Sequence, residues 1–199
     1  MIKVFFILIK EQCLKLQLIL LDDLFYRGTG PTLFRSAYLV TFNADKSDAG
    51  VPVEPEARLP ISRLELDVSN LLELDEKEGL IKFNVAGYYK IYFTVSAYPS
   101  VNDVEFDPTK DIVSVGFKET NTDNVYLGVG QWVYNAEPVE LSACGIIAVV
   151  DTAVTYELSN LGKYKIFLQT PDLTNLSSKS YFSNSLVTLV IDYLGKQGA

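Results

Sequence analysis

Four carboxylates fall within nine residues of the 199-residue chain, in a polar stretch that follows Pro99. They are Asp103, Glu105, Asp107 and Asp111. Hard oxygen ligands of this kind suit calcium. The stretch lacks the glycine and the spaced bidentate glutamate of a helix-loop-helix calcium site, and a solvated acidic loop has the same composition. The sequence therefore predicts either a calcium site or a solvent-facing loop here, and it indicates no other cofactor.

Catalytic chemistry has few candidates in this chain. It has no histidine, which removes the commonest general base and the commonest transition-metal ligand. A hydrolytic site would need a carboxylate pair such as Glu157 and Asp192 acting on a glycosidic bond, but lone carboxylates on strands usually face solvent. Ser142 and Cys144 do not form a nucleophile elbow, because Gly-x-Ser-x-Gly is absent. We therefore expect no enzymatic activity.

The single tryptophan, Trp132, lies in the same stretch as Tyr126 and Tyr134, each of which is an even number of positions away from it. On a regular strand the three rings would share one face and would form a platform on which sugar rings stack. The alternative interpretation is an aromatic stripe at an interface between sheets or subunits.

Composition limits the class of protein. The net charge of -8, with 17 basic residues spread along the chain, argues against nucleic-acid binding. A hydrophobic fraction of 48% is ordinary for one globular domain, and the 12 tyrosines and 11 phenylalanines favour strands. The two cysteines, Cys13 and Cys144, lie in unlike settings and do not indicate a disulfide framework.

The first 27 residues differ from the rest, because charged residues interrupt their apolar tracts. Neither a secretory signal nor a membrane-spanning helix fits this pattern well. Three interpretations stay open, namely a degenerate signal or membrane-proximal anchor, an oligomerising stem, or sequence outside the natural domain. Membrane contact through residues 1–21 is left undecided. Residues 28–32 have the composition of a linker, which predicts an N-terminal segment at 1–32 and a domain at 33–199.

The clearest strand signal in the chain is residues 87–98. Alternate positions predict a core face made of Tyr89, Ile91, Phe93, Val95 and Ala97. The opposite face would normally be polar, yet it carries Tyr88, Tyr92 and Tyr98. Either a second protein surface covers these tyrosines or they pack against neighbouring strands of the same subunit.

Similar signals predict about ten strands, and no segment after residue 30 keeps a helical period. The expected strands are 36–43, 71–74, 80–85, 87–98, 112–117, 124–134, 139–150, 153–158, 164–168 and 185–194. Three prolines predict an irregular or edge-like segment between residues 52 and 60. The fold class is therefore all-β, an antiparallel two-sheet jelly-roll sandwich that follows a short N-terminal segment outside the domain.

Three stretches carry a resemblance to a known family. They are the turn and aromatic strand at 79–91, the small-apolar strand at 143–151 and the apolar strand at 185–191. Together they resemble the jelly-roll heads of the complement first-component q and tumour necrosis factor superfamily. The likeness is greatest to bacterial members that follow collagen-like stalks on spore or cell surfaces. The chain holds a single Gly-Pro-Thr triplet before the first strand, and one triplet cannot form a collagen helix.

The resemblance implies a homotrimer in which Tyr88, Tyr92 and Tyr98 pack about a threefold axis. It implies a non-enzymatic head domain of a bacterial surface or spore-coat (exosporium) protein, located outside the cell and serving assembly or adhesion to a protein or carbohydrate ligand. Some members of the family bind calcium near the trimer apex. The alternative function is a carbohydrate-binding jelly-roll module from a tail fibre or a polysaccharide-degrading system.

Overall fold

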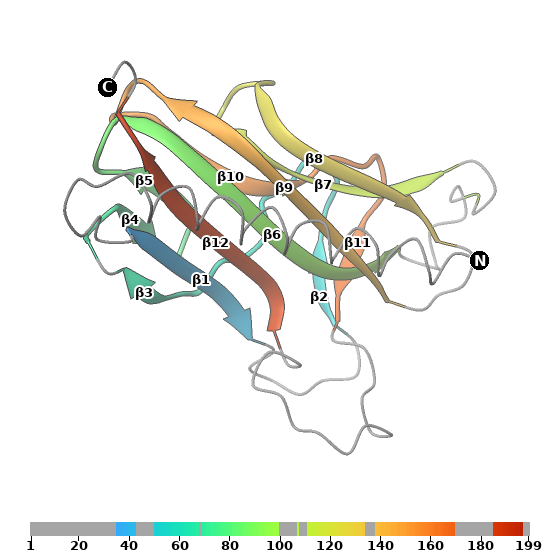
Figure 1. Ribbon diagram of the computed structural model, residues 1–199. Helices are drawn as coiled ribbons and strands as arrows, with labels where there is room; N and C mark the ends of the chain where they lie inside the picture. Colours follow the sequence, from blue (N-terminus) through green and yellow to red (C-terminus); the bar gives the residue numbers. More distant parts are fainter. Residues whose placement is uncertain are drawn as a thin grey trace, which may run out of the picture. The chain divides into compact units, whose positions relative to one another are not determined.

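A computed structural model of the chain describes residues 35–42, 50–67, 69–99, 107, 111–133, 138–169 and 185–196. These residues form twelve β-strands in two antiparallel sheets and contain no helix (Figure 1). The prediction of an all-β, antiparallel two-sheet fold is confirmed. No helix long and apolar enough to cross a membrane occurs in this described part. The predicted domain boundary after residue 32 and the segment 1–21 lie outside the described residues.

The larger sheet is built around β6 (Gly87–Pro99), the strand expected at 87–98. β9 (Val139–Val149) pairs with one edge of β6 along nearly its whole length. β12 (Ser185–Gly195) pairs with most of the other edge, and β11 (Ile166–Leu168) pairs with its last residues. The sheet is completed by β2 (Val51–Val53) beside β11, and by β1 (Ser36–Phe42) and then β3 (Arg63–Asp67) beside β12.

The smaller sheet has five strands and covers one face of the larger sheet. In spatial order its strands are β4 (Leu72–Asp75), β5 (Leu80–Phe83), β10 (Thr155–Asn160), β7 (Ile112–Glu119) and β8 (Val125–Trp132). Each of these five strands overlaps a range expected from the alternation of apolar residues.

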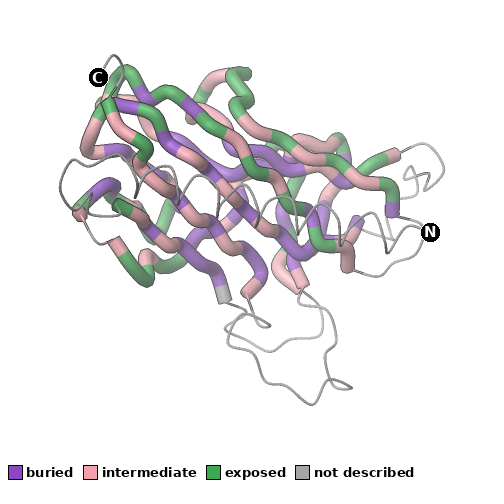
Figure 2. The backbone as a smooth tube through the Cα atoms, in the orientation of Figure 1, coloured by how far each residue is buried: buried purple, intermediate pink, exposed green. Residues whose placement is uncertain are grey.

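The core lies between the two sheets, where alternate residues of β6 are buried (Figure 2). Tyr89, Ile91, Phe93, Val95 and Ala97 are all 0% exposed, which confirms the predicted core face. The ring of Tyr89 packs 4.5 Å from that of Phe83 on β5, measured between centroids. Its hydroxyl donates to the Val85 carbonyl at 2.5 Å, so the buried oxygen is satisfied. Burial first, and then Tyr193, raise the pKa of Tyr89 to about 12.

Glycine is required at the start of β6, where that strand meets the end of β12. Gly87 has φ of 154°, and a Cβ at this position would lie 2.4 Å from the Gly195 carbonyl oxygen. The same Cβ would lie 2.6 Å from a ring carbon of Tyr193. The register of β6 and β12 shifts at this point, between Tyr193 and Gly195. A side chain at position 87 would force these two strand ends apart.

Two strands were not expected from the sequence, β2 and β3, which explains why the count is twelve rather than about ten. Both are edge strands of the larger sheet. β2 has only three residues, and its central Pro52 has no N–H for a ladder but is tolerated at an edge. Because both strands are half exposed, their apolar content is low and the strand signal is correspondingly weak.

Candidate functional site

The candidate site is the outward face of the seven-stranded sheet, the face turned away from the five-stranded sheet. Residues in register on neighbouring strands share a face. On this face one register row crosses five strands and is apolar throughout. We call it the outer row, and it consists of Leu66 on β3, Tyr38 on β1, Val190 on β12, Tyr92 on β6 and Cys144 on β9.

The ends of the outer row are open to solvent. Leu66 is 52% exposed and Cys144 is also exposed, whereas the three central side chains are half-buried. A neighbouring row carries Ile146, which is 64% exposed, and the polar residues Lys90 and Asp192. Ser36 donates its hydroxyl to Asp192 at 2.7 Å. The face therefore combines an apolar centre with a neighbouring polar strip, a composition that subunit interfaces share.

The three tyrosines predicted at a subunit interface all lie on this outward face of β6. Tyr88 is 37% exposed, Tyr92 lies in the outer row, and the Tyr98 ring stacks on that of Phe167 with centroids 5.4 Å apart. The five-stranded sheet buries none of them, because it covers the opposite face. At about 3.3 Å per residue, Tyr88 and Tyr98 lie about 33 Å apart along the strand. Their part in a trimer stays a prediction.

The acidic loop is described only in part, because Asp103 and Glu105 lie outside the described residues. The carboxylate of Asp111 already has donors of its own. One oxygen accepts the Tyr164 hydroxyl at 2.7 Å and the Asp107 N–H at 2.9 Å, and the other lies 3.0 Å from Lys163 Nζ. The Asp107 N–H, followed by the hydroxyl of Tyr164 and by Lys163, lowers the pKa of Asp111. A calcium ion at Asp111 would have to displace these donors, and the described residues contain no cluster of three or more metal-binding side chains.

The predicted aromatic platform on β8 needs a correction. The register of β7 and β8 skips Tyr126, since Phe117 pairs with Leu127 and Lys118 with Val125. At this bulge the ring of Tyr126 lies on the side of Tyr156, 5.8 Å from that ring, and Tyr126 stays 41% exposed at the edge of the sheet. Trp132 lies on the outward side and is 56% exposed. The structure therefore separates Tyr126 from Trp132, and Tyr134 lies outside the described residues.

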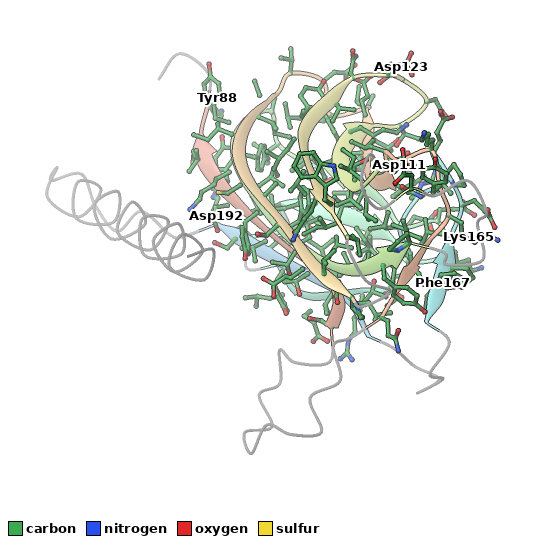
Figure 3. All side chains as sticks on the ribbon, turned by 90° about the vertical axis from the view of Figure 1, so that its right-hand side faces the viewer. Tyr88, Asp111, Asp123, Lys165, Phe167 and Asp192 are labelled. Carbon is green, nitrogen blue, oxygen red and sulfur yellow. The ribbon has the colours of Figure 1, made fainter. Side chains whose placement is uncertain are left out.

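The carboxylate pair considered for hydrolysis is also separated. Asp192 lies on the outward face of the seven-stranded sheet, on the side of the sandwich opposite Asp111 and Asp123 (Figure 3). Glu157 lies on β10 of the other sheet and points away from the core, between the buried Tyr156 and Leu158. Two sheets pack about 10 Å apart, so these outward-pointing groups are farther apart than a glycosidase pair.

Glu157 is nevertheless buried, at 5% exposure, which corrects the expectation that it faces solvent. Arg58 from the segment before β3 covers it, with Nε 2.7 Å from one carboxylate oxygen. Ser159 donates to the other oxygen at 2.7 Å, and Lys118 Nζ lies 3.7 Å from the same oxygen. Burial alone would raise the pKa of Glu157, but the Ser159 and Arg58 hydrogen bonds outweigh it and lower the pKa. Sequence reasoning missed this cluster because Arg58 and Glu157 are 99 residues apart.

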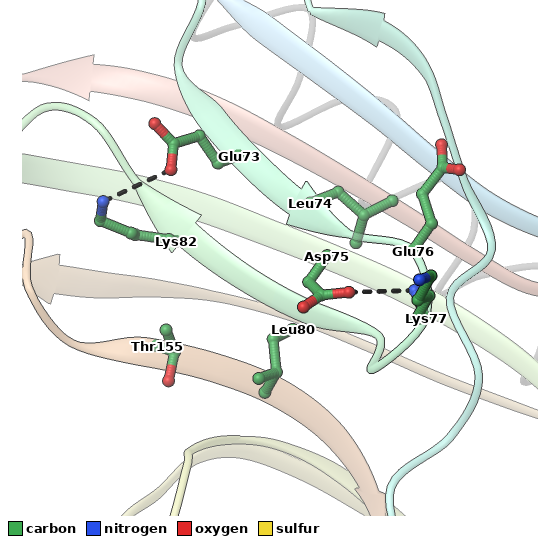
Figure 4. Close-up of a pocket in the computed structure, with 8 residues that line it drawn as sticks. All are labelled: Glu73, Leu74, Asp75, Glu76, Lys77, Leu80, Lys82 and Thr155. Carbon is green, nitrogen blue, oxygen red and sulfur yellow. Dashed lines mark hydrogen bonds and ion pairs between the residues drawn. The ribbon is translucent and has the colours of Figure 1, made fainter.

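A shallow depression of about 750 Å³ lies beside the β4–β5 hairpin (Figure 4). Contacts within the hairpin hold two of its carboxylates. Glu73 pairs with Lys82 at 3.4 Å, and Asp75 accepts the Lys77 N–H at 3.0 Å. These contacts shape a turn that ends at Gly79, whose N–H donates to the Asp75 carbonyl at 2.7 Å. The depression therefore has the groups of a stable hairpin.

Comparison with known proteins identifies the fold. No protein-family model matches the chain, and no curated protein matches its sequence. The structure of Eiger TNF from S. frugiperda is similar, with a TM-score of 0.55, 15% identity, and coverage of 83% of this chain and 96% of that one. Murine APRIL at pH 5.0 has a TM-score of 0.52 and 11% identity, with coverage of 81% and 99%.

The globular domain of zebrafish complement 1qA has a lower TM-score of 0.47 and 9% identity, with coverage of 82% and 99%, and the assignment does not depend on it. At these identities the likeness shows the fold alone. Eiger TNF and murine APRIL at pH 5.0, which have the higher TM-scores, share the fold of this chain. This likeness agrees with the resemblance found in the sequence. The chain therefore has a tumour necrosis factor-like jelly-roll fold.

Proposed function

We propose that this chain is a non-enzymatic head domain that assembles as a homotrimer through the outward face of its seven-stranded sheet. The observation that carries the proposal is the outer row, in which five apolar side chains from five strands lie side by side on a face that the second sheet leaves uncovered. The sequence resemblance, which predicts a homotrimer, supports the same assembly.

The size of this face suits a subunit interface. Five strands spaced about 4.8 Å apart span about 19 Å, and β6 from Tyr88 to Tyr98 spans about 33 Å. The face therefore covers on the order of 600 Å² in projection, and a stable interface buries roughly 800 Å² of each partner. Side chains that project from the sheet make the accessible area larger than the projected area, so the area of this face agrees with the area that a stable interface buries.

A threefold ring also needs a second surface, because each subunit offers different patches to its two neighbours. The edge of the sheet formed by β9 provides one. Val150, just after the strand and beyond the area counted above, is 74% exposed. It can contact the outer row of the next subunit while the outer row of its own subunit contacts the previous one.

The oligomeric state tests the proposal. Light scattering after size-exclusion chromatography should give about three times the chain mass of 22.2 kDa at micromolar concentration. Tyr92→Lys puts an unpaired charge in the centre of the proposed interface and should give a folded monomer. Trp132→Lys introduces the same charge at an exposed aromatic of the other sheet and should leave the trimer intact. A wild-type monomer at about 10 µM, or a trimer that survives Tyr92→Lys, would contradict the proposal.

From the sequence resemblance we also propose a biological role. The chain would be the head domain of a bacterial cell-surface or spore-surface protein that serves adhesion or structural assembly. The tumour necrosis factor-like fold supports a head domain and an extracellular location. Immunolabelling of intact and permeabilised cells of the source organism tests the location, since a surface head should be labelled without permeabilisation. Labelling only after permeabilisation would refute it.

A further inference from the structure

A second exposed apolar surface lies on the five-stranded sheet, at the far side of the sandwich from the outer row. Trp132 ends β8 and is 56% exposed, and Ile112, its register partner on β7, is 42% exposed. Within the described part of the chain, the indole of Trp132 has no hydrogen bond or ring contact. We call Trp132 and Ile112, together with Gly130 beside them, the Trp132 platform.

Glycines make this surface flat. Gly130 and Gly128 share the outward side of β8 with Trp132, and Gly116 lies opposite Gly128 on β7. A Cβ at Gly130 would lie 2.8 Å from Ile112 Cδ1, so the isoleucine side chain lies over the glycine. Leu161 covers Gly116 in the same way, since a Cβ there would lie 2.5 Å from Leu161 Cδ1. The aliphatic side chains therefore lie over glycines beside the indole, and Trp132 stays 56% exposed.

The exposed area is too small for a protein partner. A tryptophan buries about 150–250 Å² when fully covered, so Trp132 at its exposure offers on the order of 100 Å², and Ile112 brings the platform to about 200 Å². A stable protein interface needs roughly 800 Å² on each side. An area of this size fits one or two rings of a small ligand. The net charge of -8 also argues against nucleobases, which arrive with phosphates.

Polar groups border the platform. Ser114 lies opposite Gly130 in the register and on the same outward side, and its Cβ is 3.4 Å from where a Gly130 Cβ would lie. A further polar group is the ion pair of Lys163 and Asp111, in which Lys163 is 71% exposed and Asp111 directly precedes Ile112 in the chain. Small-ligand sites typically combine such an apolar surface with a few polar groups that fix orientation.

We propose that the Trp132 platform binds a neutral saccharide, with the apolar face of a pyranose ring stacked on the indole. The axial C–H groups of a pyranose carry partial positive charge, and the face of an indole is the negative part of its quadrupole. Ring hydroxyls point outward from the stacked ring, where Ser114 and the Lys163–Asp111 pair can exchange hydrogen bonds with them. The binding residues all come from one subunit, so this site does not rest on the proposed trimer.

The fluorescence of Trp132 gives a direct test, because it is the only tryptophan in the chain. The full chain is titrated with neutral cello-, galacto- and chito-oligosaccharides, and calorimetry measures affinity where the emission changes. We expect a saturable change with at least one series. Trp132→Ala should weaken that binding about tenfold or more, a change of 1.4 kcal/mol, and Trp132→Phe should retain most of it because the ring remains.

Val125→Ala is the matched control, since Val125 is 44% exposed on the same strand but distant from the platform, and it should bind like the wild type. The exposed Trp132→Ala change should leave the thermal midpoint nearly unaltered, so loss of binding can be separated from unfolding. No saturable change with any series up to about 10 mM would overturn the proposal. Unchanged saccharide binding by Trp132→Ala would also overturn it. A fluorescence response to proline-rich peptides but to none of the saccharides would do the same. The monomeric Tyr92→Lys variant should still bind, which keeps this test independent of the trimer.

Discussion

Replacing the buried carboxylate of Glu157 tests how the segment before β3 is held on the five-stranded sheet. Glu157→Gln keeps the shape of the side chain but removes the charge that Arg58 Nε approaches at 2.7 Å and Lys118 Nζ at 3.7 Å. A hydrogen bond to a charged group contributes about 1.5–3 kcal/mol. Arg58 is 26% exposed and keeps the Glu78 carbonyl at 2.7 Å, so part of its charge is rehydrated in the variant. We expect a loss of about 2 kcal/mol at neutral pH.

The loss should depend on pH in a defined direction. The pKa of Glu157 is lower in the folded chain than its ordinary value of 4.5. Its contribution to the free energy of unfolding is therefore complete above the unfolded pKa and disappears as pH falls through the folded pKa. Glutamine does not titrate, so the difference between wild type and Glu157→Gln should be constant from about pH 8 to about pH 5 and should shrink below that.

Urea unfolding followed by far-ultraviolet circular dichroism measures both quantities, at one protein concentration because the stability of an oligomer depends on it. The thermal midpoint should fall by about 4–8 °C. Glu73→Gln is the control, because the Glu73–Lys82 pair is exposed at 62% and 43% and should contribute at most about 1 kcal/mol. A loss below about 0.5 kcal/mol for Glu157→Gln, or a loss unchanged at about pH 3, would refute the reasoning.

Three further changes test the fold and the acidic loop. Phe93→Ala removes a ring that is 0% exposed at the centre of β6 and should cost about 3–5 kcal/mol in urea unfolding, whereas a cost below about 1 kcal/mol would place the core elsewhere. Gly116→Ala puts a Cβ 2.5 Å from Leu161 Cδ1 and 2.9 Å from a backbone carbonyl, so the thermal midpoint should fall, and an unchanged midpoint would show that the β7–β8 pair relaxes freely. If calcium binds the acidic loop through Asp111, the rise in thermal midpoint caused by added calcium should be larger in Tyr164→Phe than in the wild type. The reason is that this substitution removes the hydroxyl that occupies an Asp111 oxygen. Weaker stabilisation in that variant would exclude Asp111 as a ligand.

Several features could be predicted from local sequence because they depend on neighbours along the chain. The alternation in 87–98 predicted which residues of β6 face the core, since side chains of any strand alternate between its faces. The turn expected at the start of the 79–91 stretch is present, and Asp75 accepts the N–H groups of Lys77 and Glu78 there. An all-β sandwich followed from the spacing of these signals, and the faces of Tyr88, Tyr92 and Tyr98 followed with it.

The sequence by itself predicted the strands other than β2 and β3 and the alternation of faces along them, whereas the tertiary structure alone decided which faces meet. The outer row joins Leu66, Tyr38 and Val190, which are far apart in the chain, and only the strand register brings them together. One bulge reversed the side of Tyr126 without any local signal, because a bulge depends on the partner strand. Burial of Glu157 likewise depended on Arg58 crossing from another segment. Strand register and the burial of a side chain by a distant segment are long-range properties, so alternation along one strand cannot encode them.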